Sequence, residues 1–215
     1  MNILIVDDHP VMIEVYEYIL STSTKINYNL TCVSSCEEAH DTLTEKKLTN
    51  TFSLAILDYK LPEYSHMNIT NGCDIARLVR AYNPKCKIVM VTGQNKILFI
   101  YDLLHKIYPE ALILKNDLVI NHLPQIIESV LDGNHYYSAT VKSYTAKMWN
   151  ENLTLDEDDR TIIFNLQKGH KVKDLPKIIN LSASTIQRRI FNIKKIFKVD
   201  DDSSLILELT SRGFL

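Results

Sequence analysis

The chain has 215 residues, of which 46% are hydrophobic and 23% are charged, and its formal net charge is −2. This length suggests one large domain or two modest ones, and the hydrophobic content is sufficient for a substantial core. No apolar run approaches the length of a membrane span and no export signal follows Met1, so we expect a cytoplasmic protein that does not enter a membrane.

From residue 2 to residue 131, short apolar runs alternate with longer amphipathic segments. Runs of four or five apolar residues are typical of strands that are covered on both faces. We expect strands at 2–6, 29–33, 53–57, 87–91 and 111–114. We expect helices at 10–20, 36–47, 72–82, 96–107 and 119–131. This alternation predicts an α/β fold with a five-stranded, doubly wound parallel sheet.

Acidic residues follow two of the expected strands. Asp7 and Asp8 come after the first strand, and Asp58 comes after the third. In doubly wound sheets, sites lie at the carboxyl ends of the strands, so these carboxylates should share one edge. Like charges a few ångströms apart repel by roughly 4 kcal/mol per pair at an effective dielectric near 20. A hard divalent cation such as Mg²⁺ would relieve this repulsion, and so would protonation of one carboxylate.

Two further polar side chains are expected at the same edge. Thr92 follows the fourth strand and Lys115 follows the fifth. Together with the acids, this arrangement over residues 1–125 resembles a response-regulator receiver domain, which has a flavodoxin-like fold. The resemblance implies that Asp58 accepts a phosphoryl group from a sensor histidine kinase, with Thr92 and Lys115 contacting that group. It also implies a Mg²⁺ site formed by Asp7, Asp8, Asp58 and the backbone carbonyl of Lys60.

The sequence departs from this family at three places that bear on signalling, and one of them is Lys60, two residues after Asp58, where a lysine side chain at the entry to the site is expected to alter the rate of dephosphorylation. Leu112 stands where receiver domains usually have an aromatic switch residue; either it packs in the core, or Tyr101 or Tyr108 takes over the role. Gly72, which precedes the third helix, stands fourteen residues after Asp58, so the loop at 63–71 is lengthened. That loop either shields the phosphoryl group, contributes to kinase choice, or is a tolerated surface insertion.

Two other interpretations of the first domain remain. A phosphohydrolase of the haloacid dehalogenase type also forms a phosphoaspartate after a strand, but it needs a second acid two residues on. Here that residue is Lys60, so we do not expect an enzyme and assign no catalytic residue. The alternative function is a phosphorylation-independent regulator whose receiver serves for dimerisation or docking.

His9 is interpreted as a loop residue before the first helix, with proton transfer as the alternative.

Charge is distributed unevenly along the chain. Residues 168–198 contain nine Lys and Arg residues and a single acid, Asp174, a local balance of +8 in a chain of net charge −2. Such asymmetry points to an anionic partner for the basic segment, and nucleic acid is the commonest one. A basic helix face that is merely solvated is the alternative. The four cysteines, Cys32, Cys36, Cys73 and Cys86, lack metal-ligand spacing and are expected to be reduced thiols.

The C-terminal part reads as a small all-α domain. Residues 126–152 are expected to contain the end of the last receiver helix and a polar linker, and residues 153–215 the second domain. Asp156 is a plausible N-cap and Gly169 a helix stop. Two helical patterns then follow, joined by the short polar turn 180–182, which is the spacing of a helix-turn-helix.

This second domain resembles the DNA-binding domain of LuxR/FixJ-type regulators. The residues that carry the resemblance are Leu155, Gly169, Ser182, Ser184, Thr185 and Ile186. The resemblance implies a recognition helix at about 184–197, with Gln187 and Arg188 reading base edges. Phosphate contacts are expected from Lys173, Thr185, Arg189 and Lys195. Phe191 replaces a usual lysine and either contacts thymine methyl groups or packs. The whole chain would then act as a homodimer on promoter DNA.

Overall fold

The structure is a computed structural model that describes residues 1–22, 27–45, 51–150 and 155–215. These residues form two compact units: the first contains residues 1–94 and 103–142, and the second contains residues 95–102 and 143–215. Two expectations lie outside the described residues, namely the end of the second expected helix at 46–47 and the boundary between linker and second domain at 152–153. None of the helices in the described ranges is long and apolar enough to cross a membrane.

The first unit is built on a parallel sheet with the strand order β2-β1-β3-β4-β5-β6. The expected strands are present as β1 (Asn2–Val6), β2 (Asn29–Val33), β3 (Leu54–Asp58), β4 (Lys87–Thr92) and β5 (Ala111–Leu114). Strands β3 and β5 are buried along their whole length, as continuous apolar runs predict. The prediction of a doubly wound parallel sheet is therefore confirmed.

The sheet has one strand more than expected. β6 (Tyr136–Tyr137) pairs in parallel with β5. The backbone N–H of Tyr136 donates to the carbonyl of Glu110 at 2.9 Å, and that of Ser138 donates to the carbonyl of Leu112 at 3.1 Å. A two-residue strand is too short to show an alternating pattern in a sequence. The prediction of five strands is therefore one strand short.

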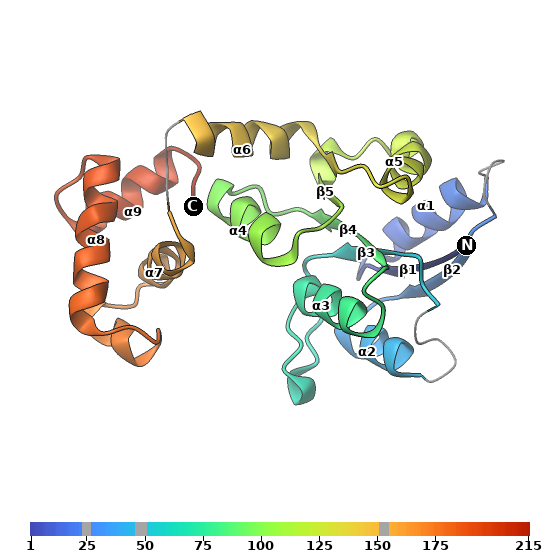
Figure 1. Ribbon diagram of the computed structural model, residues 1–215, viewed down its shortest axis with the longest axis horizontal. Helices are drawn as coiled ribbons and strands as arrows, with labels where there is room; N and C mark the ends of the chain where they lie inside the picture. Colours follow the sequence, from blue (N-terminus) through green and yellow to red (C-terminus); the bar gives the residue numbers. More distant parts are fainter. Residues whose placement is uncertain (23–26, 46–50, 151–154) are drawn as a thin grey trace. The chain divides into compact units, whose positions relative to one another are not determined.

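Helices cover both faces of the sheet (Figure 1). α1 (Pro10–Ser21) and α5 (Leu123–Leu131) lie on one face, and α2 (Cys36–Thr44) and α3 (Gly72–Tyr82) lie on the other. α4 (Ile97–Ile107) connects β4 to β5. Local chemistry explains several helix starts: Pro10 occupies the first position of α1, Ser35 accepts the Glu38 N–H at α2, and Asn71 accepts the Cys73 N–H at α3.

The segment expected to be a polar linker contains a helix, α6 (Ala139–Asn150). Its first turn is held by Asp117, whose carboxylate accepts hydrogen bonds from the Ser138 hydroxyl at 2.7 Å and the Thr140 N–H at 2.9 Å. A carboxylate at this position is favourable because the first N–H groups of a helix have no partner within the helix. The cap lies more than twenty residues upstream of the helix, so the local sequence gives no sign of it.

The second unit contains α7 (Glu157–Gln167), the 3-10 helix η4 (Val172–Lys177), α8 (Ala183–Phe197) and α9 (Asp202–Ser211). The expected N-cap is confirmed, because Asp156 forms a capping box with Asp159, and Gly169 follows α7 with a φ of 85°. The first helical pattern of the helix-turn-helix forms a 3-10 helix that contains Pro176. The core contains Ile162, Ile163, Leu175, Ile186, Ile190, Ile193, Phe197, Leu205, Leu209 and Phe214.

Candidate functional site

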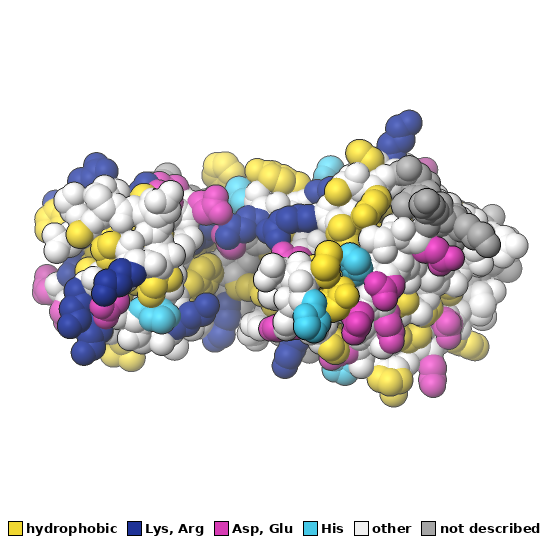
Figure 2. All heavy atoms as spheres, turned by 90° about the horizontal axis from the view of Figure 1, so that it is seen from below, with side chains coloured by type: hydrophobic (Ala, Val, Ile, Leu, Met, Phe, Trp, Pro, Cys, Tyr) yellow, Lys and Arg dark blue, Asp and Glu magenta, His cyan; other side chains and the backbone are white. Residues whose placement is uncertain are grey.

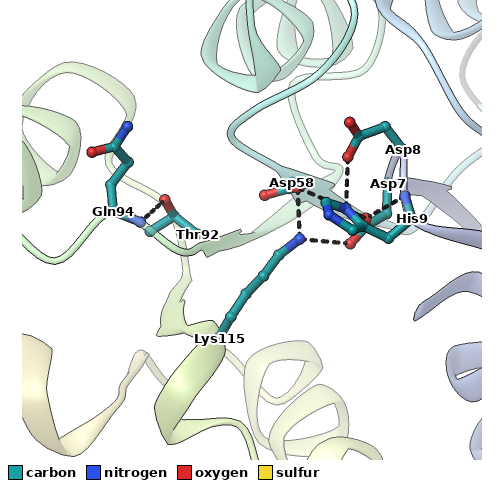
Figure 3. A network of polar contacts seen from close by, with 7 residues as sticks. All are labelled: Asp7, Asp8, His9, Asp58, Thr92, Gln94 and Lys115. Carbon is teal, nitrogen blue, oxygen red and sulfur yellow. Dashed lines mark hydrogen bonds and ion pairs between the residues drawn. The ribbon is translucent and has the colours of Figure 1, made fainter. Parts of the chain in front are cut away.

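Three carboxylates meet at the carboxyl edge of the sheet. Asp58 is the last residue of β3, and Asp7 and Asp8 follow the neighbouring strand β1. The Asp7 and Asp58 residues are only 1% and 3% exposed. Figure 3 shows the side chains of Asp7 and Asp58 close together on this edge, with Asp8 beside them. The parallel pairing of β1 and β3 produces this arrangement, because it brings both strand ends to the same edge.

Lys115, the residue after β5, reaches into this acidic pocket (Figure 3). Its Nζ lies 2.7 Å from Oδ2 of Asp58 and 3.4 Å from Oδ2 of Asp7. Burial raises the pKa of Asp58 above its usual value, although the hydrogen bond and charge of Lys115 oppose the rise; the charge of Asp7 adds to it. Burial alone would lower the pKa of Lys115, but its hydrogen bond to Asp58 and the charges of Asp58 and Asp7 raise it. The pocket therefore holds more negative charge than one ammonium balances.

The acidic cluster is compatible with a divalent metal ion. Asp7, Asp8, His9 and Asp58 each offer one ligand atom, and these atoms lie within 4.8 Å of one another. Within the described ranges, Asp7 Oδ2 and Asp8 Oδ1 are buried and accept no hydrogen bond of good geometry, although Lys115 Nζ and His9 Nδ1 lie 3.4 Å and 2.7 Å away, respectively. Buried polar atoms normally have a partner, and hard divalent ions prefer carboxylate oxygens. The donor set therefore fits such an ion.

His9 has a closer connection to the pocket than its place in the sequence suggested. It is the residue before α1, and its backbone N–H donates to Oδ1 of Asp7 at 3.0 Å. Its Nδ1 atom lies 3.0 Å from Oδ1 of Asp7 and 2.7 Å from Oδ1 of Asp8. The interpretation as a loop residue describes its backbone but misses these side-chain contacts. Its position directly after two acids was the one signal in the sequence.

Thr92 and the backbone of Lys60 lie at the same edge of the sheet as Asp58. Thr92 ends β4, is buried, and accepts the N–H of Gln94 at 3.0 Å through its hydroxyl (Figure 3). The Lys60 side chain is exposed, whereas its backbone hydrogen-bonds to Asp58 and acts to lower the pKa of that carboxyl. The backbone of residue 60 is therefore part of the pocket.

The lengthened loop after Asp58 is folded and ends at a close backbone approach. Tyr64 and Ile69 form an isolated antiparallel bridge, with a short 3-10 helix, η1 (Ser65–Met67), between them. The Gly72 N–H then donates to the carbonyl of Tyr59 at 2.9 Å. A Cβ atom on Gly72 would overlap with the backbone carbonyl of Asp58. Glycine thus allows α3 to start directly against the end of β3.

Leu112 and Tyr108 differ in their surroundings. Leu112 lies within β5 and is fully buried, which agrees with the expectation that it packs in the core. Tyr108 has a φ of 49° and is 67% exposed, and its carbonyl accepts a hydrogen bond from the Arg80 guanidinium. The position that is usually aromatic in receiver domains therefore contributes an aliphatic side chain to the core here.

In the second unit, α8 has one buried face and one polar, exposed face. Ser182 caps the helix by accepting the Thr185 N–H at 3.2 Å, and the Thr185 hydroxyl lies 2.9 Å from that of Ser182. The buried face consists of Ile186, Ile190, Ile193 and Phe197. The expected DNA-contacting residues on the exposed surface are Lys173, Gln187, Arg188 and Lys195. Figure 2 shows Lys and Arg side chains, in dark blue, on the surface formed by the C-terminal helices.

Arg189 differs from the other expected DNA contacts, because three carboxylates of the same unit bind its guanidinium. The nitrogen–oxygen distances are 2.7 Å to Asp156, 2.8 Å to Asp158 and 2.9 Å to Asp159. The hydrogen bond to Asp156 is the main cause that raises the pKa of Arg189. These ion pairs join α8 to the N-terminus of α7. An Arg189 that contacts phosphate would first have to leave them.

Residues 3–108 match the family model of the response regulator receiver domain. The sheet and its acidic pocket agree with this match, so residues 3–108 belong to the response regulator receiver family, as the sequence led us to expect. Across its full length it is 22% identical to the transcriptional regulatory protein ComA of Bacillus subtilis (strain 168), over 223 residues that cover 100% of this chain and 99% of ComA.

Two solved structures of RcsB have a similar fold over nearly the whole chain. One is RcsB of Salmonella enterica serovar Typhimurium bound to promoter rprA in the presence of the phosphomimetic BeF3⁻. It has 19% identity and a TM-score of 0.64, and 99% of each chain is covered. The other contains two RcsB dimers bound to two parallel DNAs, with 19% identity, a TM-score of 0.65 and 98% of each chain covered. At this identity, the likeness establishes the fold, which includes a C-terminal helical domain.

Proposed function

We propose that this chain is a DNA-binding transcriptional response regulator that is controlled by phosphorylation of Asp58. The observation that carries the proposal is the surroundings of Asp58. Its carboxylate lies at the end of β3, is 3% exposed, and has the Nζ of Lys115 at 2.7 Å. A cation held beside a nucleophilic carboxylate stabilises the charge of an incoming phosphoryl group, and such positioning supplies most of the catalysis in phosphoryl transfer.

In the proposed transfer, an oxygen of Asp58 attacks the phosphorus of a phosphohistidine on a sensor histidine kinase. A phosphorus–oxygen bond forms, the phosphorus–nitrogen bond breaks, and the released imidazole takes up a proton. Lys115 moves its contact from the carboxylate to a phosphoryl oxygen. The Thr92 hydroxyl accepts the Gln94 N–H and keeps its own O–H as a donor for a second phosphoryl oxygen.

We propose Mg²⁺ as the ion of this pocket. When bound, it supplies positive charge that screens the carboxylates and the phosphoryl oxygens. The buried Asp7 Oδ2 and Asp8 Oδ1 atoms support a cation here, because neither accepts a hydrogen bond of good geometry from a described residue. The proposed ligands are Asp7, Asp8, Asp58 and the backbone carbonyl of Lys60.

The second part of the proposal is that α8 binds promoter DNA in the major groove, with the chain acting as a homodimer on two half-sites. Gln187 and Arg188 would read base edges, and Lys173, Thr185 and Lys195 would contact phosphates. Arg189 would join them only after release from its carboxylates. RcsB, which shares the fold, has been solved as dimers bound to DNA. The four free cysteines support the proposed cytoplasmic location.

The second candidate function is a regulator whose receiver works by docking or dimerisation without phosphorylation. The observation in its favour is Leu112, which is fully buried at the position where receiver domains usually have an aromatic switch residue. Under this alternative the pocket would still bind a cation, but DNA binding would not depend on Asp58.

Intact mass spectrometry together with a DNA-binding titration distinguishes these two functions. The full chain is incubated with Mg²⁺ and an acyl phosphate, in parallel with Asp58→Asn and with a chelated sample. We expect one phosphoryl adduct that requires Mg²⁺ and is missing from Asp58→Asn, together with tighter DNA binding of the modified protein. An adduct on both proteins would contradict the assignment of Asp58. An adduct without any change in DNA binding would favour the docking alternative.

A further inference from the structure

Phe191 lies in the middle of the polar surface of α8. It is 55% exposed, and the residues that flank it along this surface are Arg188, one turn before, and Lys195, one turn after. The buried face of α8 is already formed by four apolar side chains that are no more than 4% exposed. Phe191 therefore does not pack in the core. An aromatic side chain exposed between two cations calls for a partner that is both anionic and locally apolar.

The Nζ atom of Lys195 lies 4.4 Å from the centroid of the Phe191 ring. Such a cation–π contact holds the ring and the ammonium together at an exposed site. More than half of Phe191 nevertheless remains accessible. A ligand that approaches this surface would consequently meet an ammonium and an apolar ring at the same time.

We propose that Phe191 contacts the 5-methyl group of a thymine in the major groove and thereby contributes to the choice of DNA sequence. This inference rests on the proposed DNA binding by α8. Thymine is the base that presents an apolar group in the major groove, and phenylalanine is among the side chains suited to contact it. Lys195 would contact a phosphate next to that base.

Charge argues against a second copy of this chain as the partner for Phe191. In a symmetric contact through this surface, Arg188 and Lys195 would face the same two cations of the other copy.

The exposed Leu207, on α9, provides a comparison, because it is 72% exposed and does not belong to α8. Leu207 therefore serves as the matched control, as an apolar side chain exposed elsewhere on the same unit.

The test replaces single thymines by deoxyuridine, which removes only the 5-methyl group. The full-length chain, after treatment with an acyl phosphate, is first used to select its preferred duplexes from random DNA. Each thymine of a selected duplex is then replaced in turn, and binding is measured for wild type, Phe191→Ala, Phe191→Leu and Leu207→Ala. The methyl of one thymine per half-site is expected to be worth about fourfold in affinity, the ratio that corresponds to ~0.8 kcal/mol per buried CH₂.

The proposal requires that Phe191→Ala abolishes this fourfold difference, that Phe191→Leu keeps most of it, and that Leu207→Ala leaves it unchanged. If Phe191→Ala weakens thymine and deoxyuridine duplexes by the same factor, the methyl contact is refuted while DNA binding by α8 stands. A change of oligomeric state in Phe191→Ala, seen by light scattering, would instead assign Phe191 to a contact between copies. Failure of the wild type to select any sequence would overturn the proposed function itself.

Discussion

The Nζ atom of Lys115 lies 2.7 Å from Oδ2 of Asp58, so the residue after β5 is connected to the last residue of β3 across the intervening strand β4. The same ammonium lies 3.4 Å from Asp7. One cation therefore serves two buried carboxylates. Any change that removes it leaves two acids close together, whereas a change at Asp58 leaves Lys115 with Asp7 as a partner.

Lys115→Met is expected to destabilise the first unit at neutral pH by about 2 kcal/mol. This value is below the ~3–5 kcal/mol of a fully buried pair because the Lys115 side chain is 23% exposed. Because burial raises the pKa of Asp58, its ionised form disfavours folding at neutral pH, so Asp58→Asn should stabilise the first unit and should recover part of the loss when combined with Lys115→Met. Calorimetric unfolding of the full chain, with and without Mg²⁺, measures these differences. Equal stability of Lys115→Met and wild type without metal would show that the ion pair contributes little.

Gly72→Ala is expected to destabilise the first unit by about 1–3 kcal/mol, the usual cost of inserting atoms into well-packed surroundings. The new Cβ would overlap with the carbonyl of Asp58, which is backbone and therefore cannot move aside easily. Because the end of β3 would shift, the rate of adduct formation at Asp58 should also fall. Urea unfolding and intact mass measure the two effects.

Gly93→Ala is the matched control for this substitution. Gly93 also lies in a loop beside the pocket, but a Cβ there would have no described atom within 4 Å. Its stability is therefore expected to stay within about 0.5 kcal/mol of wild type. A similar loss from both substitutions would mean that the close approach at Gly72 is not the cause.

The pocket could be predicted from the sequence because regular alternation fixes where strands end. Once β1, β3 and β5 are parallel, Asp7, Asp58 and Lys115 must come to one edge, whatever the details of packing. The N-cap at Asp156 could also be predicted, because capping depends on neighbouring residues only. Local patterns were sufficient in these places.

Features that depend on residues far apart in the sequence could not be predicted. Arg189 is 33 residues from Asp156, and helical periodicity says only that it lies off the buried face, not that three carboxylates hold it. Thr140 is 23 residues from Asp117, so neither α6 nor its cap shows in the local pattern. Both contacts arise only when the fold brings separate elements together.

Protonation of Asp156 is expected to loosen α7. Burial alone would raise the pKa of Asp156, but the Asp159 N–H and Arg189 lower it in the folded chain. A carboxyl with a lowered pKa stabilises the fold above the pKa of the unfolded state, and that contribution disappears as the pH falls through the folded value. Protection of the α7 amides against hydrogen exchange, relative to their intrinsic exchange rates, should therefore fall as the pH drops below the ordinary pKa of an aspartate carboxyl.

Two substitutions separate the cap at Asp156 from its charge. Asp156→Asn keeps a capping side chain but cannot titrate, so its α7 amides should lack this part of the acid response. Asp156→Ala removes the cap as well and should therefore cost about 1 kcal/mol more than Asp156→Asn. An unchanged acid response in Asp156→Asn would assign the response to other carboxyls near Arg189.

Arg188→Ala and Lys195→Ala should weaken DNA binding in different ways. Arg188 is exposed on α8 and suited to a bidentate contact with guanine, so its loss should cost about 1–3 kcal/mol on selected duplexes and relax the preference at one base pair. Lys195 is a proposed phosphate contact, so Lys195→Ala should lower the affinity for all sequences alike. It should also reduce the slope of log affinity against log salt concentration by about one. Titrations of selected and scrambled duplexes at several salt concentrations measure both effects. Equal loss on all duplexes in Arg188→Ala would move Arg188 from base reading to phosphate contact, and a sequence-dependent loss in Lys195→Ala would move Lys195 the other way.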